Sequence, residues 1–413
     1  KRYLAGVVVT TDTIDEAEPL INIHMDGPHF NRAGWEHIVK NCGGRLPISI
    51  KAVPEGTVVG TKNVLFTMVN TDPKCYWLTN YLETLLVQVW FPMTVATSSR
   101  AQKQIIADYL VKTGSAETAA EAATSFKLVD FGYRGVSSVE SAALGGAAHL
   151  VNFQSTDNLA AILMCKSYYG EPMAGFSIPA AEHSTITSWG REGEVDAYRN
   201  MLTQYPKGLV AVVSDSYNIY EACEKMWGGE LRPMIEKRDG ALVVRPDSGE
   251  PHVIVVEVLT ILEKAFGSSQ TPTGHKMLPP CIRVIQGDGI SYESLSQILA
   301  AMDAAGFAAD NLSFGSGGAL LQKVNRDTQK CAFKCAEITK ADGSTVNVYK
   351  DPITDPGKQS KRGRLTLELE EGSLVTKSES SGSLEKDVLV EVFRDGHLLV
   401  DHLFSDIRVR AQI

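Results

Sequence analysis

Seven short apolar runs between residues 128 and 318 constrain the fold of this chain more than any other feature. Each run ends in glycine or a polar residue, and a helix-compatible stretch separates it from the next. Strands that alternate with helices form right-handed βαβ units and a parallel sheet. We therefore expect an α/β fold in which about seven parallel strands close into an irregular (β/α) barrel. The runs with their polar ends are residues 128–134, 150–153, 176–179, 210–215, 242–247, 284–288 and 312–318.

The segments before and after these runs predict an antiparallel sheet with helices, because apolar residues recur there at helical spacing or alternate with polar ones. The expected helices cover residues 31–41, 72–91, 98–112 and 114–126, and Pro92 is expected to end the second of them. The expected strands cover residues 46–53, 57–69, 334–338 and 365–369, with a hairpin over 388–399 that turns at Asp395-Gly396. We predict two domains: a discontinuous α+β domain of residues 1–115 and 327–413, and a barrel of residues 116–326.

Charge and cysteine usage exclude several classes of protein. The formal net charge of −9 argues against a general nucleic-acid-binding protein, whose phosphate contacts need a basic surface. No apolar stretch approaches the roughly 18 residues of a membrane helix, and the first residues lack a secretory signal pattern. No Cys-x-x-Cys pair occurs, and no histidine lies near Cys331 and Cys335, which disfavours a structural zinc site there. We expect reduced thiols and a cytoplasmic protein.

The polar residues at the ends of the runs should gather at one rim, since a barrel of this type carries its site at the C-terminal ends of its strands. The last run differs, because Gly315 to Gly318 lead into a helix-compatible segment, which is the outline of a phosphate-binding turn. Its spacing is not Gly-x-Gly-x-x-Gly, so a dinucleotide is not indicated. The other predicted rim residues are Asp130, Arg134, Asp157, His183, Asp215, Arg245, Asp247 and Asp288.

Several catalytic motifs are missing. Ser177 is followed by Ile-Pro and does not form Gly-x-Ser-x-Gly, no apolar run ends in lysine, and no HExxH occurs. His183 stands beside Glu182, and a histidine held by a carboxylate is a better nucleophile or base. The basic loop 358–364 has three interpretations. It is a solvated cluster of charges on the surface, a weak nuclear-localisation signal, or a loop that closes over a polyphosphate.

Six motifs in this order resemble the nicotinamide phosphoribosyltransferase family, a group of type II phosphoribosyltransferases. The resemblance runs from about residue 31 to the C-terminus. It implies transfer of a phosphoribosyl group from phosphoribosyl pyrophosphate to nicotinamide, with Mg²⁺ as cofactor and ATP as a co-substrate. The motifs cover residues 130–138, 179–186, 213–217, 245–249, 285–289 and 314–318.

The resemblance also implies roles for individual residues. His183 would be phosphorylated by ATP, Asp215 would orient it, and Asp247 would hold the ribose with Asp288. Asp157 would accept from the carboxamide, and as a carboxylate it would repel nicotinate. No metal ligand is assigned. The remaining substrate-binding residues would be Phe131, Arg134, Ser177, Arg245, Gly287, Gly317, Gly318, Arg326, Lys334, Lys350 and Lys358.

Members of this family are homodimers with shared sites, so Arg134, Lys334, Lys350 and Lys358 would act on ligands bound mainly by the other subunit. The family also carries a further N-terminal segment whose aromatic covers the second face of the pyridine ring, and the sequence begins after it. Two alternatives stay open at this point: a nicotinate phosphoribosyltransferase, and a non-catalytic extracellular binding protein on the same scaffold.

Overall fold

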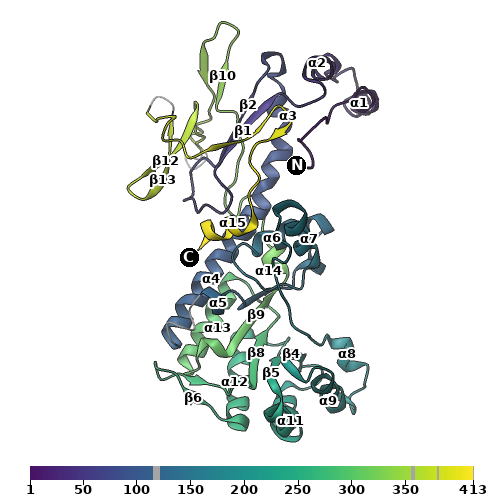
Figure 1. Cartoon of the computed structure of the whole chain (residues 1–413), viewed down its shortest axis with the longest axis vertical. Coiled ribbons are helices and arrows are strands. Elements are labelled where there is room, and N and C mark those ends of the chain that lie inside the picture. The colour runs from purple at the N-terminus through teal and green to yellow at the C-terminus, as the bar shows by residue number, and fades with distance from the viewer. Residues whose placement is uncertain (115–120, 355–358, 379–380, 413) are drawn as a thin grey trace. The chain divides into compact units, whose positions relative to one another are not determined.

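The computed structural model describes residues 1–114, 121–354, 359–378 and 381–412 (Figure 1). The chain divides into two compact units. An α+β unit comprises Lys1–Trp90 and Gln329–Arg410, and an α/β unit comprises Phe91–Thr328 with the last residues from Ala411. The sequence places the first boundary at residue 115, whereas helix α4 (Trp90–Thr113) groups with the α/β unit from Phe91 onward.

The α/β unit is built on a five-stranded parallel sheet with the order β3-β9-β8-β5-β4. Four of the five strands carry runs of three or more buried residues, as expected for a parallel sheet that is covered on both faces. The predicted mixed α/β class with a parallel barrel sheet is confirmed for this part of the chain. The strands are β3 (Leu128–Asp130), β4 (Lys207–Val213), β5 (Asp239–Arg245), β8 (Ile282–Gln286) and β9 (Leu312–Ser316).

Isolated parallel bridges continue the sheet beyond its two edges. Beside β3, Asp130 pairs with Thr156, and Ser155 pairs in turn with Phe176. Beside β4, Ala180 pairs with Ala211. Isolated bridges, not continuous strands, therefore occupy two of the seven predicted strand positions, so the barrel is irregular, as predicted.

One of these positions is not where the sequence predicts it. Leu150–Phe153 was expected as a strand because it is apolar, but helix α6 (Val139–His149) runs up to it and it forms a turn. Leu150 and Phe153 have no exposed surface. They are buried by side-chain packing, not by pairing with another strand. The pairing residues come later, at Ser155 and Thr156.

Helices surround this sheet (Figure 1). The largest hydrophobic core of the unit lies between the sheet and these helices and includes Val244, Val284, Leu259, Ile298 and Trp227. The remaining helical segments are α5 (Glu121–Thr124), η3 (Tyr133–Gly135), α7 (Leu159–Tyr169), α8 (His183–Thr187), α9 (Glu194–Gln204), α10 (Ile219–Glu221), the π-helix η4 (Ala222–Glu230), α11 (Arg232–Lys237), α12 (Pro251–Phe266), α13 (Tyr292–Ala304), η5 (Ala309–Asn311) and α14 (Gly318–Leu321). A two-stranded ribbon is formed by β6 (Ser269–Gln270) and β7 (Lys276–Met277).

The α+β unit holds a four-stranded antiparallel sheet with the order β15-β14-β1-β2, and its core includes Ile38, Ile48, Leu78 and Phe393. The predicted hairpin at Asp395-Gly396 is confirmed. Its strands are β1 (Ile48–Ala52), β2 (Phe66–Asn70), β14 (Val390–Arg394) and β15 (His397–Leu398), and two ribbons pair β10 (Glu337–Thr339) with β11 (Thr345–Asn347) and β12 (Leu365–Glu370) with β13 (Ser373–Ser378). The helical segments are α1 (Thr11–His24), α2 (Arg32–Cys42), η1 (Pro73–Cys75), α3 (Leu78–Leu86), η2 (Val87–Val89) and α15 (Phe404–Ala411).

Pro92 does not end a helix, contrary to the prediction. Helix α3 already ends at Leu86, and Pro92 lies in the first turn of α4. Proline is tolerated there because the first helical N–H groups have no intrahelical partner. The predicted helix over 98–112 forms the C-terminal part of α4. Among the described residues of the helix predicted over 114–126, only Glu121–Thr124 are helical, as α5.

Within the described residues, no helix combines the length and the apolar character needed to cross a membrane. The seven cysteines all lie in the described part of the chain, and no disulfide joins any of them.

Candidate active site

The C-terminal ends of the parallel strands lie in register, which brings the residues that follow them to one edge of the sheet. Asp130 at the end of β3 pairs with Ser316 at the end of β9, and Val213 at the end of β4 pairs with Arg245 at the end of β5. The next residues along the chain therefore leave the same edge. The predicted rim is a consequence of this register.

His183 is held by a carboxylate from a neighbouring strand end. Its Nε2 lies 3.0 Å from Oδ1 of Asp215, and its Nδ1 lies 3.9 Å from Oδ2 of Asp247. The second oxygen of Asp215 accepts a 2.5 Å hydrogen bond from the hydroxyl of Ser248. Asp215 is nearly buried, at 6% side-chain exposure, while the imidazole is 41% exposed. A rigid carboxylate thus orients an imidazole that solvent or a ligand can reach.

The position of Glu182 beside His183 suggests that its carboxylate holds the histidine, but Glu182 has another role. It is the N-cap of α8, where its carboxylate accepts from the backbone N–H of Ser184 while Thr185 bonds back to the cap. This capping box fixes the start of the helix on which His183 is the first residue. The hydrogen bonds from Ser184 lower the pKa of Glu182, and the charges of His183 and Arg134 add to that effect.

Arg245, Asp247 and Phe131 form a second group at the rim. Arg245 donates to both oxygens of Asp247, at 3.1 and 3.0 Å, and its guanidinium lies 5.7 Å from the centre of the Phe131 ring. Two glycines give the ring its space. A Cβ on Gly315 would lie 2.0 Å from the Phe131 ring, and one on Gly287 would lie 2.9 Å from Asp247 and 3.3 Å from the same ring. The half-buried ring offers a flat apolar surface beside a fixed cation.

Asp157 and Ser177 form a third group, which is joined to Asp130, the residue that precedes Phe131. The backbone N–H of Asp157 donates to the carbonyl of Asp130, and the Ser177 hydroxyl donates to the Asp157 carboxylate. Solvent reaches Asp157, yet the protein around its carboxylate desolvates it enough to raise its pKa, and the charge of Asp130 acts in the same direction. The hydrogen bond from Ser177 and the charge of Arg245 oppose that rise.

The glycine turn has the geometry expected of it. β9 ends at Ser316, Gly317 is the N-cap of α14, and α14 begins at Gly318. A Cβ on Gly318 would meet no atom within 4 Å, so the backbone there is open to a ligand. Asp288 follows β8 and is exposed, and no side chain in the described part of the chain pairs with its carboxylate.

The remaining predicted residues are not brought into these groups. Arg326 is an exposed side chain that pairs with Asp327 at 3.1 Å. Arg134 is exposed in η3, and its charge acts on Glu182. Lys334 and Lys350 are exposed residues of the α+β unit. Lys358 lies outside the described residues.

Two residues support the site without a role assigned from the sequence: Ser248 was not predicted at all, and Asp130 was predicted at the rim but given no function. Ser248 holds the second oxygen of Asp215, and its only sequence signal is its place directly after Asp247. Asp130 is fully buried, and it accepts from the N–H of Gly132 at 2.7 Å and from the amide of Asn158 at 3.0 Å. Burial raises the pKa of Asp130, and these hydrogen bonds oppose the rise. It holds together the turn from which Phe131 and Gly132 leave the strand.

Comparison with known proteins agrees with this geometry. Residues 126–397 match the model of the nicotinate phosphoribosyltransferase family, which includes the whole rim described above. The chain belongs to this family. Residues 1–50 match a second model, the N-terminal domain of nicotinamide phosphoribosyltransferase.

Curated members of this phosphoribosyltransferase family are similar over most of their length. The chain is 53% identical over 411 residues to a nicotinamide phosphoribosyltransferase from Xanthomonas campestris pv. campestris, covering 98% of this chain and 86% of the relative. It is 32% identical to a nicotinamide phosphoribosyltransferase from Acinetobacter baylyi, covering 89% of this chain and 76% of the relative. Membership makes the chain an enzyme of the phosphoribosyltransferase class.

A solved structure shares the fold of this phosphoribosyltransferase. The nicotinate-nucleotide pyrophosphorylase from Pyrococcus furiosus superposes with a TM-score of 0.55 at 15% identity, covering 89% of this chain and 80% of that structure. At this identity the likeness concerns the fold alone, and it agrees with the parallel barrel sheet described above.

Proposed function

We propose that the chain transfers the phosphoribosyl group of 5-phosphoribosyl 1-pyrophosphate to nicotinamide, giving nicotinamide mononucleotide and pyrophosphate for NAD salvage. The observation that carries the choice of base is the Asp157–Ser177 pair: the backbone of Asp157 bonds to Asp130, the residue before Phe131, and its carboxylate is close enough to Arg245 to be affected by that charge. An ionised carboxylate accepts a hydrogen bond from the NH₂ of a carboxamide, but it repels the carboxylate of nicotinate. The names of the two curated relatives agree with this base.

The reaction needs support for positive charge on the ribose. The bond from the anomeric carbon to pyrophosphate breaks, the pyridine nitrogen forms the new bond, and the ring carries cationic character between these events. Asp247 and Asp288 would hold the ribose hydroxyls at adjacent strand ends and stabilise that charge. Phe131 and Arg245 would hold the base, with Gly287 leaving room for both. Gly317 and Gly318 would bind the 5′-phosphate through backbone N–H groups, and Arg326 would add a positive charge to that phosphate.

The donor set also fits the Mg²⁺ that the family implies, because magnesium prefers carboxylate oxygens and Asp288 has no side-chain partner among the described residues. Asp247 is shared with Arg245 and could contribute one oxygen. When bound, Mg²⁺ would neutralise charge on the leaving pyrophosphate.

We extend the proposal to ATP as a co-substrate. The Nε2–H of His183 would donate to Asp215, which leaves the Nδ1 lone pair free. Nδ1 would attack the γ-phosphorus of ATP, the bond to ADP would break, and water would later hydrolyse the phosphohistidine. A 41% exposed imidazole held by a nearly buried carboxylate supports this role.

The direct test supplies purified protein with nicotinamide, phosphoribosyl pyrophosphate and Mg²⁺, and follows nicotinamide mononucleotide by chromatography. Parallel reactions contain nicotinate in place of nicotinamide. We expect a kcat/KM for nicotinamide at least about tenfold above that for nicotinate. A higher value for nicotinate would assign the chain to the other base, and no product from either base would reject the proposal.

We also propose that two subunits share each site, with Arg134, Lys334, Lys350 and Lys358 acting on ligands bound mainly by the other copy. The support is that Arg134, Lys334 and Lys350 are exposed and stand outside the three groups at the rim. Mixing Lys350→Ala chains with Asp247→Ala chains tests this, because random reassociation would restore about a quarter of the wild-type activity if the two residues serve one site from different subunits. No recovery after verified subunit exchange would show that each site belongs to a single chain.

A further inference from the structure

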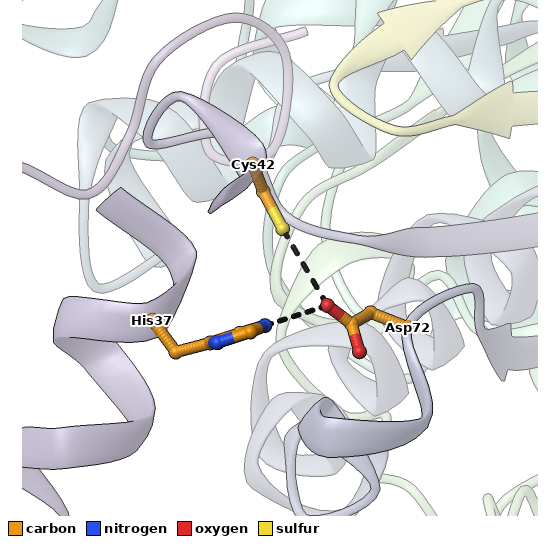
Figure 2. A group of neighbouring side chains, drawn as sticks. All are labelled: His37, Cys42 and Asp72. Atoms are coloured by element: carbon orange, nitrogen blue, oxygen red, sulfur yellow. Dashed lines mark hydrogen bonds and ion pairs between the residues drawn. The ribbon is translucent and has the colours of Figure 1, made fainter. Parts of the chain in front are cut away.

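A cluster of three metal-binding side chain types lies in the α+β unit, outside the candidate active site. Nε2 of His37 is 2.7 Å from Oδ2 of Asp72, and Sγ of Cys42 is 4.0 Å from the same oxygen. The three potential ligand atoms all lie within 4.8 Å of one another. Figure 2 shows the imidazole and the thiol converging on one carboxylate oxygen.

The backbone around the cluster fixes all three side chains. His37 and Cys42 come from α2, which ends at Cys42 because Gly43 adopts the left-handed conformation. Asp72 is the N-cap of η1, and its Oδ1 accepts from the N–H of Lys74 at 2.8 Å. The cap occupies one carboxylate oxygen and leaves the other, Oδ2, to face His37 and Cys42.

We propose that His37, Cys42 and Asp72 bind a zinc ion that joins the end of α2 to the loop before η1. Zinc takes His nitrogen, Cys sulfur and carboxylate oxygen at about 2.0 to 2.3 Å in tetrahedral geometry, so its ligand atoms stand roughly 3.2 to 3.6 Å apart. The 2.7 Å nitrogen–oxygen distance must widen and the 4.0 Å sulfur–oxygen distance must shorten, each by about half an ångström. These movements would come from rotation of the side chains, and water would fill the fourth position.

The charges around the thiol favour a cation. The hydrogen bond from His37 lowers the pKa of Asp72, so this ligand is an anion at neutral pH. Partial burial raises the pKa of Cys42, and the negative charges of Asp72 and Asp395 raise it further. The same two carboxylates attract a dication. On binding, Cys42 releases its proton to solvent, and the sulfur lone pair forms the bond to zinc.

His37 also has a partner for its second nitrogen. The side-chain amide of Asn41 lies 3.0 Å from Nδ1 of His37. A half-turn of that amide gives up its 3.2 Å bond to the His37 carbonyl and presents its oxygen to Nδ1–H. The proton then resides on Nδ1, and the Nε2 lone pair is free for the metal. Ligating histidines commonly have such a partner, which fixes the tautomer.

Cobalt(II) provides a direct probe, because a thiolate ligand gives a sulfur-to-cobalt charge-transfer band in the near ultraviolet and tetrahedral geometry gives intense visible bands. Full-length protein freed of metal by a chelator would be titrated with Co²⁺, and the cobalt would then be displaced with Zn²⁺. We expect one cobalt per chain with both sets of bands, and a higher thermal midpoint with zinc than without.

Variants decide whether these residues hold the ion. Cys42→Ser should abolish the charge-transfer band, and His37→Gln, which keeps a donor for Asp72, should weaken cobalt binding at least about tenfold. Cys335→Ser is the matched control, since Cys335 is an exposed thiol far from this cluster in sequence, and its titration should match the wild type. Circular dichroism would verify that each variant is folded. An unchanged band in Cys42→Ser, or no band in the wild type at equimolar cobalt, would overturn the proposal.

Discussion

Nε2 of His183 and Oδ1 of Asp215 lie 3.0 Å apart, although 32 residues separate them in the chain. The pair forms because α8 begins at His183, while Asp215 leaves the end of β4, beside which Ala180 forms a bridge with Ala211. Asp215 is fixed on its other side by Ser248. The orientation of the imidazole therefore depends on three segments that meet only in the folded protein.

Asp215→Asn should slow phosphorylation of His183. The amide can present its NH₂ to Nε2, which favours the wrong tautomer and places the proton on Nδ1. We expect the rate of phosphohistidine formation from labelled ATP to fall about a hundredfold or more. Ser248→Ala, which removes only one support of Asp215, should lower it by about tenfold or less. Equal rates in Asp215→Asn and wild type would contradict the assigned role.

Asp157→Ser should narrow the preference for nicotinamide over nicotinate. Removing the carboxylate removes both an acceptor for the amide and a repulsion of the acid, so we expect the ratio of the two kcat/KM values to fall at least about tenfold. Ser177→Ala keeps the charge and is the matched control, with a smaller change in the ratio. If the kcat/KM ratio fell as far in Ser177→Ala as in Asp157→Ser, the shape of the pocket, not its charge, would distinguish nicotinamide from nicotinate.

The same preference should depend on pH in the wild type. Desolvation raises the pKa of Asp157, so its carboxyl takes up a proton at a higher pH than an ordinary aspartate. Protonation removes the repulsion of nicotinate, and the ratio should therefore fall as the pH is lowered from 8 toward 5. Measuring both kcat/KM values across this range tests the sign, and Asp157→Ser should show a flat ratio. A wild-type ratio that rises on acidification would contradict it.

Gly315→Ala should weaken binding of the base. A Cβ there would lie 2.0 Å from Cε2 of Phe131, so the ring must move away from its place beside Arg245. We expect the KM for nicotinamide to rise about tenfold or more. Gly318→Ala is the contrasting variant: its Cβ meets no atom within 4 Å, so the fold tolerates it, but the methyl group enters the proposed phosphate site. That variant should raise the KM for phosphoribosyl pyrophosphate instead. The same change in both variants would contradict two separate subsites.

His149 should make the protein less stable in acid. Burial lowers its pKa to about 4, and its ring nitrogens face the hydroxyl of Ser99 at 3.0 Å and the carbonyl of Leu128 at 3.1 Å. In the unfolded chain its pKa is about 6.5, so between these values the unfolded state binds the extra proton. Stability should thus fall by about 3 kcal/mol as the pH drops from 7 to 4 on this account alone.

The midpoint of thermal unfolding at several pH values measures this loss. His149→Gln should be less stable than the wild type at pH 7, because glutamine replaces a well-packed ring. It should lose less stability than the wild type when the pH is lowered. A parallel decline in both proteins would assign the acid sensitivity to other groups.

The positions of the five strands of the parallel sheet could be predicted from the sequence because they depend on local patterns. Apolar runs that end in aspartate, arginine or glycine predicted β3, β4, β5, β8 and β9, and the residues after them lie at the expected edge. The turn from Ser316 to Gly318 was also predicted from the sequence, since glycine lets the backbone approach a ligand more closely than other residues do. The sequence pattern of a strand or a turn lies in consecutive residues, so its position can be predicted from those residues alone.

Tertiary structure decided which groups meet. Leu150–Phe153 is as apolar as a strand, but it packs as a turn while Ser155 and Thr156 take its place in the sheet. The position of Glu182 next to His183 suggested that it holds the histidine, yet Glu182 caps a helix. The ring is held by Asp215, which only the family resemblance had paired with His183. Likewise His37 and Cys42 meet Asp72 only because α2 lies against the loop before η1. Hydrogen bonds and metal ligation depend on distances of a few ångströms, which are set by packing between segments far apart in the chain.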